Sequence, residues 1–405
     1  MILTYRYRLS PTKGQRADLD DILEAQRELY NAALQERIDA YRKAGIARTY
    51  IDQTRGLTEW RKSDPEARSV PVSMQRATLH RVDRAFKGFF RRVSRARKPG
   101  FPRFRGRSSF DSFGFRENSG YEVQGNRMRF KGLRGTLRIH LHRPLPDGSR
   151  IRCCHLRRSI HGWHVCFVVD FPEAQTLSVG PRRVVGVDVG LTTLAVLSDG
   201  TVIPRLRADS DGQPRLRVLQ RAVSRKAPGS RRRRLASRAV ASFRAAIKRR
   251  RLNHLHCASA KLVGEYDVIA IEDIPIMGLA SGPLAKNVRD ASWGRFFTML
   301  RYKAERAGKR IVAVDAQGTS QECTACRVQV TKTLGERWHE CPNCGLSIDR
   351  DLNAAINILY RAGVGPGPLN VAGCGMRAGE NIVRWLRDRT ERRTIETLPS
   401  YCADS

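Results

Sequence analysis

The sequence RRVVGVDVGLTTLAVLSDGTVI, residues 182–203, contains two apolar runs separated by a short polar turn. The second run ends at Ser198-Asp199-Gly200, which favours a second turn before Val202 and Ile203, so the pattern predicts a meander of three strands. Asp188 lies inside the first run, and alternation along a strand places Gly186 and Gly190 on the same face. The glycines leave space beside the acid. A buried carboxylate is costly unless another group compensates its charge.

Two later segments also carry acids in structured surroundings. Residues 266–273, YDVIAIED, are typical of a buried strand that ends on Glu272 and Asp273. Residues 351–361 predict a helix with Asp351 at its start, where helix capping alone would explain a carboxylate. The other elements expected here are helices within 215–251 and 291–307 and a strand at 310–315. This order predicts an α/β fold with an RNase-H-like mixed sheet.

Asp188, Glu272 and Asp351 suit one purpose together. Carboxylates that lie close repel one another unless a cation lies between them, and Mg²⁺ prefers such oxygen ligands. We therefore expect the three acids to be catalytic and to bind two Mg²⁺ ions. Such a pair, about 4 Å apart, activates a water and stabilises the leaving oxygen in phosphodiester hydrolysis.

A second metal site is predicted from the cysteines. Of ten Cys, four form two CxxC pairs with fourteen residues between them: Cys323, Cys326, Cys341 and Cys344. Four thiolates at this spacing predict one structural Zn²⁺ ion in a ribbon, with a redox pair or an iron–sulfur cluster as alternatives. We treat His339 as a non-ligand because four Cys complete the shell. A closed shell also predicts no catalysis there.

The charge of the chain favours a polyanionic partner. The 405 residues include 75 Lys and Arg against 39 Asp and Glu, a net charge of +36. Residues 215–251 contain fifteen basic and no acidic residues, and residues 95–116 interleave basic residues with Phe. A solvated basic face and core packing of the Phe side chains are the respective alternatives. The candidate nucleic-acid contacts are Arg97, Lys98, Phe101, Arg103, Phe104, Arg105, Arg231, Arg232, Arg233, Arg234, Lys248 and Arg249.

The N-terminal half predicts a strand at 1–9, a helix that begins near Pro11, and a second helix over about 72–95, with a polar connection of uncertain form between the helices. Alternating residues within 120–172 predict further strands, so we expect a small β-barrel carrying a helical insert. No run of 18 apolar residues occurs, which predicts no transmembrane helix and no membrane partner. Arg6 and Arg8 argue against a signal peptide, so we expect a location in the cytosol.

Seven segments carry a family resemblance. GVDVGLTTLAVLSDG, AIEDIPIMGLA, TSQECTAC…CPNCG and DRDLNAAINIL resemble the RuvC-type nuclease motifs and zinc ribbon of TnpB proteins, which are transposon-encoded, RNA-guided DNA nucleases. YRYRLSPT, VDRAFKGFFRRV and PRFRGRSSFDSFGF resemble the N-terminal half of that family. The resemblance extends from residue 1 to about 362. Compact type V CRISPR effectors share these motifs.

The resemblance implies a multidomain architecture, an activity and partners. The implied parts are a wedge barrel at 1–10 and 99–180, a helical recognition insert at 11–98, a RuvC-like nuclease domain at 181–318 and 349–362, a zinc ribbon at 319–348 and a flexible tail at 363–405. By motif position Asp188, Glu272 and Asp351 match the family's catalytic acids, and Asp351 is preferred over Asp349. The implied partners are a guide RNA from the transposon end and double-stranded target DNA.

The expected function is therefore RNA-guided, Mg²⁺-dependent cleavage of double-stranded DNA next to a short adjacent motif, in a prokaryotic cytosol at the nucleoid. One protein per guide is favoured. Three alternatives stay open at this point: a CRISPR effector of the same chemistry, a nuclease-dead RNA-guided repressor, and a guide-free structure-selective nuclease or RNase H. The three acids argue against the repressor, and the net charge of +36 argues against the guide-free enzyme.

Overall fold

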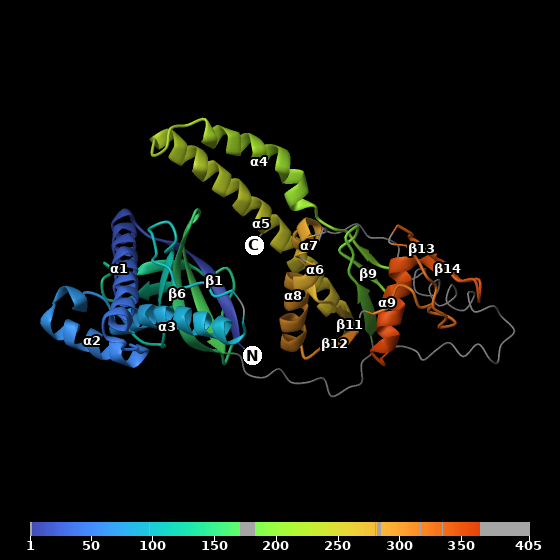
Figure 1. Cartoon of the computed structure of the whole chain (residues 1–405), viewed down its shortest axis with the longest axis horizontal. Helices are drawn as coiled ribbons and strands as arrows, with labels where there is room; N and C mark the ends of the chain where they lie inside the picture. The colour runs from blue at the N-terminus through green and yellow to red at the C-terminus, as the bar shows by residue number, and fades with distance from the viewer. Residues whose placement is uncertain are drawn as a thin grey trace. The chain divides into compact units, whose positions relative to one another are not determined.

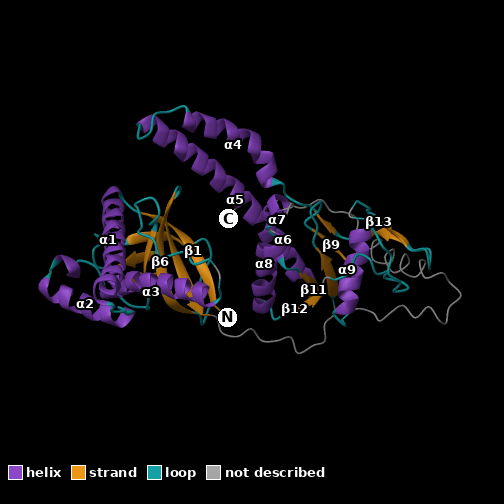
Figure 2. Cartoon of the chain, in the orientation of Figure 1, coloured by secondary structure: helices purple, strands orange, loops and turns teal. Residues whose placement is uncertain are grey.

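A computed structural model describes residues 2–96, 98–170, 183–279, 281, 285–315, 317–333 and 335–364. The expected nucleic-acid contact Arg97 and almost all of the expected flexible tail lie outside these residues. The chain divides into two compact units, Met1–Pro172 and Glu173–Ser405 (Figures 1 and 2). Within the described residues no helix is long and apolar enough to cross a membrane.

The N-terminal unit is built on an antiparallel sheet with the strand order β2-β6-β7-β1-β5-β4-β3. Its strands are β1 (Ile2–Ser10), β2 (Ser112–Phe115), β3 (Glu122–Gln124), β4 (Arg127–Arg129), β5 (Leu137–His140), β6 (Arg150–Ser159) and β7 (Gly162–Asp170). Among the described residues β2 and β3 are the two edges, so the sheet is a half barrel where the sequence predicted a barrel. The helices α1 and α3 cover edge strand β2, which removes the need for closure.

Three α-helices and a short 3₁₀ helix accompany this sheet: α1 (Lys13–Ala44), α2 (Tyr50–Ser63), η1 (Glu66–Arg68) and α3 (Val72–Ser94). The expected helices correspond to α1 and α3, and α2 occupies the connection whose form the sequence left open. Thr49 and Asp52 begin α2 with a reciprocal capping box, the local signal from which this helix could have been predicted. The apolar faces of α1 and α3 and the inner face of the sheet share one core.

The C-terminal unit contains a five-stranded mixed sheet in the order β10-β9-β8-β11-β12. The strands β8 (Val184–Asp188), β9 (Ala195–Leu197) and β10 (Val202–Ile203) form the predicted meander, and β11 (Val268–Asp273) and β12 (Arg310–Asp315) run parallel to β8. The helices are α4 (Ala208–Ser224), α5 (Arg231–Glu265), α6 (Ile276–Leu279), α7 (Ala285–Ala291), α8 (Trp293–Arg306) and α9 (Arg350–Arg361). The predicted elements occur in the expected order, and α6 and α7 are additional helices that the sequence did not predict.

The two faces of this sheet pack against different helices. Val185, Val187 and Ile271 share a core with α5 and α8, whereas Ala270 packs with Ile358 of α9. A Cβ atom on Gly186 would collide with the carbonyl oxygen of Ala355, so glycine lets α9 lie directly on β8. Figure 1 shows α9 beside the strands and α4 and α5 as two long antiparallel arms. Because side chains alternate along a strand, Asp188 and Glu272 belong to the face that α9 covers.

Candidate active site

The fold brings the three predicted acids to one edge of the mixed sheet. Asp188 ends β8, Glu272 lies near the end of β11, and Asp351 lies in the first turn of α9. Val187 pairs with Ile271 in parallel register, so the residues that follow them, Asp188 and Glu272, lie side by side. A Cβ on Gly190 would lie 3.8 Å from Oδ2 of Asp351, in van der Waals contact, so Gly190 lies beside that carboxylate.

The pKa values reflect this crowding of negative charge. Exclusion from water raises the pKa of Asp188 well above its ordinary value, and the charges of Glu272 and Asp351 raise it further. Arg350 opposes these effects. Burial also raises the pKa of Glu272, whereas a hydrogen bond from Thr319 lowers it. Without a cation, the protein therefore favours a proton on this group of carboxylates.

Helix capping does not explain Asp351. The N-cap of α9 is Asp349, whose Oδ1 accepts hydrogen bonds from the backbone N–H groups of Asp351 and Leu352 at 2.9 and 3.0 Å. The carboxylate of Asp351 instead lies 3.4 Å from Arg350 and 3.7 Å from Arg337. The neighbouring acid thus takes the capping role, and the carboxylate of Asp351 adds its charge to that of Asp188.

The arrangement of the acids fits Mg²⁺. All three offer hard oxygen ligands, and the raised pKa of Asp188 shows that its charge lacks full compensation from the protein. In the described part of the chain, only the four cysteines form a group of at least three metal-ligating side chains with all ligand atoms within 4.8 Å. Among the described residues the three acids form no such group, and their binding of two ions stays a prediction.

The four predicted zinc ligands come together at the ribbon, beside β13 (Trp338–Glu340) and β14 (Ser347–Asp349). The Sγ atoms of Cys323 and Cys344 lie 3.7 Å apart, and those of Cys326 and Cys341 lie 3.5 Å apart. Four Zn–S bonds of about 2.3 Å in a tetrahedron would separate the sulfurs by about 3.8 Å. The cluster fits one Zn²⁺ ion. His339 is buried and contacts Lys332 instead of joining the cluster.

Most of the candidate nucleic-acid contacts are exposed to solvent. Among the described candidates, the exposed ones are Lys98, Phe101, Arg103, Phe104, Arg105, Arg231, Arg232, Arg234, Lys248 and Arg249. Arg233 is half-buried and donates to the carbonyl oxygen of Lys226 at 3.0 Å. Phe101 and Phe104 remain about half exposed, at 49% and 52%, whereas Phe110, Phe113 and Phe115 are core residues. The structure thus separates exposed Phe residues, which are accessible to a nucleic acid, from core Phe residues. The sequence alone left these two roles open.

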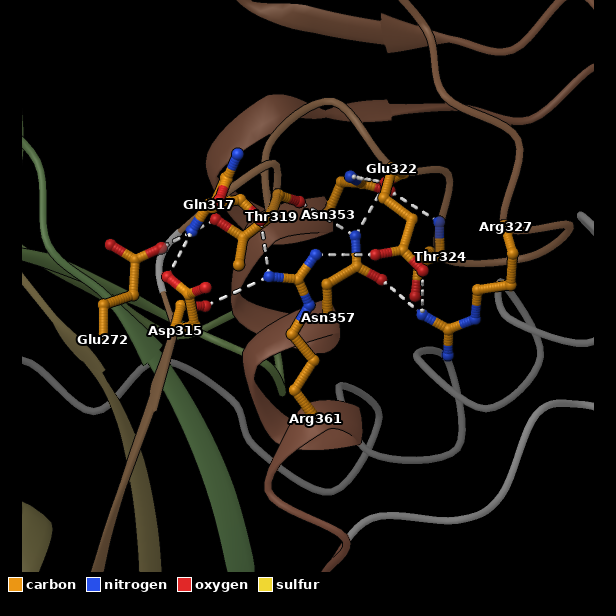
Figure 3. A network of polar contacts seen from close by, with 10 residues as sticks. All are labelled: Glu272, Asp315, Gln317, Thr319, Glu322, Thr324, Arg327, Asn353, Asn357 and Arg361. Atoms are coloured by element: carbon orange, nitrogen blue, oxygen red, sulfur yellow. Dashed lines mark hydrogen bonds and ion pairs between the residues drawn. The ribbon is translucent and has the colours of Figure 1, made fainter.

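Sequence reasoning missed a polar network that reaches Glu272 through Thr319. Buried Thr319, Asn353 and Asn357 and half-buried Arg361 connect the start of the ribbon to α9 (Figure 3). Asn353, Asn357 and Arg361 recur every four residues, which places them on one helical face, and this spacing is the signal that could have revealed them.

Comparison with known proteins identifies the family. The family model described as "Probable transposase" matches residues 167–281, and one described as "Cas12f1-like, TNB domain" matches residues 293–358. A "Helix-turn-helix domain" model matches residues 1–45, which here form β1 and the single helix α1. A putative RNA-guided DNA endonuclease of Streptomyces pristinaespiralis is 33% identical over 364 residues, covering 88% of each chain. The chain belongs to the TnpB family.

This TnpB protein has a second full-length relative in Escherichia coli K12, the putative RNA-guided DNA endonuclease InsQ. It is 24% identical over 374 residues, covering 88% of this chain and 91% of InsQ. Among solved structures, the TnpB fold is similar to that of a Cas12f1–sgRNA–target DNA complex, with a TM-score of 0.57 and 14% identity over 86% of this chain and 83% of that one. At that identity the likeness concerns the fold alone.

Proposed function

We propose that this protein is an RNA-guided DNA endonuclease that cleaves double-stranded DNA next to a short adjacent motif, with a guide RNA from the transposon end. The observation that carries the proposal is the convergence of Asp188, Glu272 and Asp351 on the α9 face of the mixed sheet. Their strand order and helix position are those that we expect of an RNase-H-like, RuvC-type nuclease domain. The relatives of this chain from Streptomyces and Escherichia coli are named as putative RNA-guided DNA endonucleases.

In this proposal the three acids hold two Mg²⁺ ions. When bound, the ions activate water for in-line attack on a phosphodiester and stabilise the leaving oxygen, which leaves a 3′ hydroxyl and a 5′ phosphate. The protein positions the ligands: β8 and β11 fix Asp188 and Glu272 side by side, and the first turn of α9 adds Asp351. Arg337 and Arg350 lie within 4.0 Å of Asp351 and add positive charge beside the site.

Basic helices would hold the nucleic acid by its backbone. Most of the basic side chains of α5 are exposed, and its N-terminal half has no buried residue before Ile247. A helix with this charge repels itself unless phosphates or salt lie nearby. The exposed Phe101 and Phe104 could stack on bases. Base pairing with the guide, rather than the protein, would then select the sequence.

The test is cleavage of a supercoiled plasmid by the protein, guide RNA and Mg²⁺. Asp188→Ala should abolish cleavage and leave guide-RNA affinity unchanged, because the substitution removes a metal ligand and no basic side chain. Equal loss of guide binding and cleavage in a folded variant would contradict the assignment. Cleavage by the wild-type protein without RNA would favour a guide-free nuclease, and binding without cleavage would favour a repressor.

A CRISPR effector of the same chemistry is the second candidate. Cas12f1 of Sulfoacidibacillus thermotolerans is 40% identical over 58 residues, but this covers only 14% of each chain. Because the family model described as "Probable transposase" matches residues 167–281, a transposon-encoded protein is favoured. Sequencing the RNA that copurifies with the protein separates a transposon-end guide from one transcribed from a CRISPR array.

A further inference from the structure

The side chain of Glu272 has a hydrogen-bond donor from outside the mixed sheet. Glu272 is buried, at 8% exposure, and Oγ1 of Thr319 donates to its Oε1 at 2.7 Å (Figure 3). Thr319 itself is 3% exposed and precedes the first zinc-ligand pair by only a few residues. A carboxylate with one oxygen engaged in this way keeps its second oxygen available for a cation.

The backbone of the segment that carries Thr319 is hydrogen-bonded to side chains of α9. Nδ2 of Asn357 donates to the carbonyl oxygen of Thr319 at 2.9 Å. Nη1 of Arg361 donates to the carbonyl oxygens of Gln317 and Asp315 at 2.6 and 3.0 Å. These hydrogen bonds fix the backbone at the threonine and before it, and so fix the point from which its hydroxyl reaches Glu272.

Two fully buried amides extend this attachment into the ribbon. Nδ2 of Asn353 and Nδ2 of Asn357 both donate to the carbonyl oxygen of Glu322, at 2.8 and 2.7 Å. Oδ1 of Asn353 accepts from the backbone N–H of Thr324 at 3.0 Å. Both asparagines are 0% exposed. A buried amide with its hydrogen bonds made resists displacement, because an unmade bond there is costly.

We propose that Thr319 is a positioning residue for the metal-binding carboxylate of Glu272, and that α9 sets its position. This inference rests on the proposed function, because it assigns Glu272 to the metal site. The helix α9 supplies Asp351 directly and fixes Thr319 through Asn357, so one rigid element determines the placement of two of the three carboxylates. Partners that hydrogen-bond to metal ligands orient them, and their loss lowers metal affinity.

The experiment measures Mn²⁺ binding to the full-length, zinc-loaded protein without nucleic acid, by electron paramagnetic resonance. The site is defined as the binding that Asp188→Ala abolishes. Thr319→Val removes the hydroxyl and keeps the branched shape, and should weaken binding about tenfold. Thr319→Ser restores the hydroxyl and should stay within about twofold of wild type. Thr78→Val is the matched control, because it removes a buried hydroxyl that donates to Gln26 at 2.7 Å in the N-terminal unit.

A purely structural role predicts a different result. Wild-type Mn²⁺ affinity in Thr319→Val, or equally weakened affinity in the Val and Ser variants, would overturn the inference. Zinc content and melting temperature are measured for each variant, and Thr319→Ala replaces Thr319→Val if the latter loses its zinc. Cleavage assays run in parallel measure the Mg²⁺ concentration that gives the half-maximal rate. This concentration should be highest for Thr319→Val and similar for Thr319→Ser and the wild type. Should the wild type bind Mn²⁺ through Asp188 but cleave no DNA with guide, the proposed function fails while the positioning role stands.

Discussion

At the scale of single residues, the acids that suit metal binding oppose folding. Burial and two neighbouring carboxylates raise the pKa of Asp188, so its ionised form is disfavoured in the folded protein. The folded state then binds a proton more tightly than the unfolded chain does. Between the unfolded pKa of about 3.9 and the raised folded pKa, stability from this group falls as pH rises.

Asp188→Asn should therefore raise the melting temperature at pH 7.5 in the absence of divalent cations, because it removes this charge. The gain should shrink as pH falls toward 4, where the carboxyl is protonated in the folded state. Millimolar Mg²⁺ should stabilise the wild type more than the variant. Scanning calorimetry checks both trends, and a variant less stable than wild type at every pH would contradict the account.

Two residue-level predictions relied only on the spacing of residues close together in the sequence, and both agree with the structure. Alternation along β8 placed Gly186 and Asp188 on one face, and CxxC spacing indicated the cysteine cluster. The roles of the acids stay predictions. Thr319 could not be identified from the sequence, because it donates to a carboxylate that only the folded chain brings near.

At the scale of elements, the arms α4 and α5 share the run of fifteen basic and no acidic residues between 215 and 251. Replacing Arg231, Arg232, Arg233 and Arg234 with Gln should weaken guide-RNA binding across sequences. Log affinity falls linearly with log salt concentration, and this dependence should become less steep by about 1 for each phosphate that the variant no longer neutralises. Filter binding at several salt concentrations measures this effect.

The matched control uses two exposed lysines from the helices of the N-terminal unit. Lys43 and Lys62 pair with Asp39 and Glu59 on their own helices, at 3.7 and 2.9 Å. Replacing both with Gln removes charge that acids already compensate, so the salt slope should stay unchanged. An equal decrease in both variants would mean that the arms contribute only net charge.

Predicting elements from the sequence succeeded where an apolar pattern was strong. The stripe within 72–95 predicted α3, and the meander within 182–203 predicted β8, β9 and β10. Helix α2 was left open because it buries only Gln53 and Leu57, which makes its apolar pattern weak. The barrel prediction was wrong in its closure, because helices covering an edge strand leave no trace in the periodicity of the strands themselves.

At the scale of the whole molecule, each hydrophobic core among the described residues lies within one unit. Leu34 of α1 is 0% exposed in the first core. Leu34→Ala should destabilise the N-terminal unit by about 2–5 kcal/mol. Calorimetry should show one transition moved to lower temperature and the other unchanged. A single transition that moves as a whole would show that the units unfold together.

Helix α9 presents Asn353, Asn357 and Arg361 to the ribbon segment and Ala355 and Leu359 to the sheet. One residue inserted into this helix would rotate everything beyond it by about 100°. The hydrogen bonds to the ribbon segment and the packing on the sheet would then be lost together, because both sets of side chains lie on the same rigid helix and turn with it. Length variation among descendants of this chain should therefore be confined to turns outside 350–361, and α9 should tolerate substitutions far better than insertions or deletions.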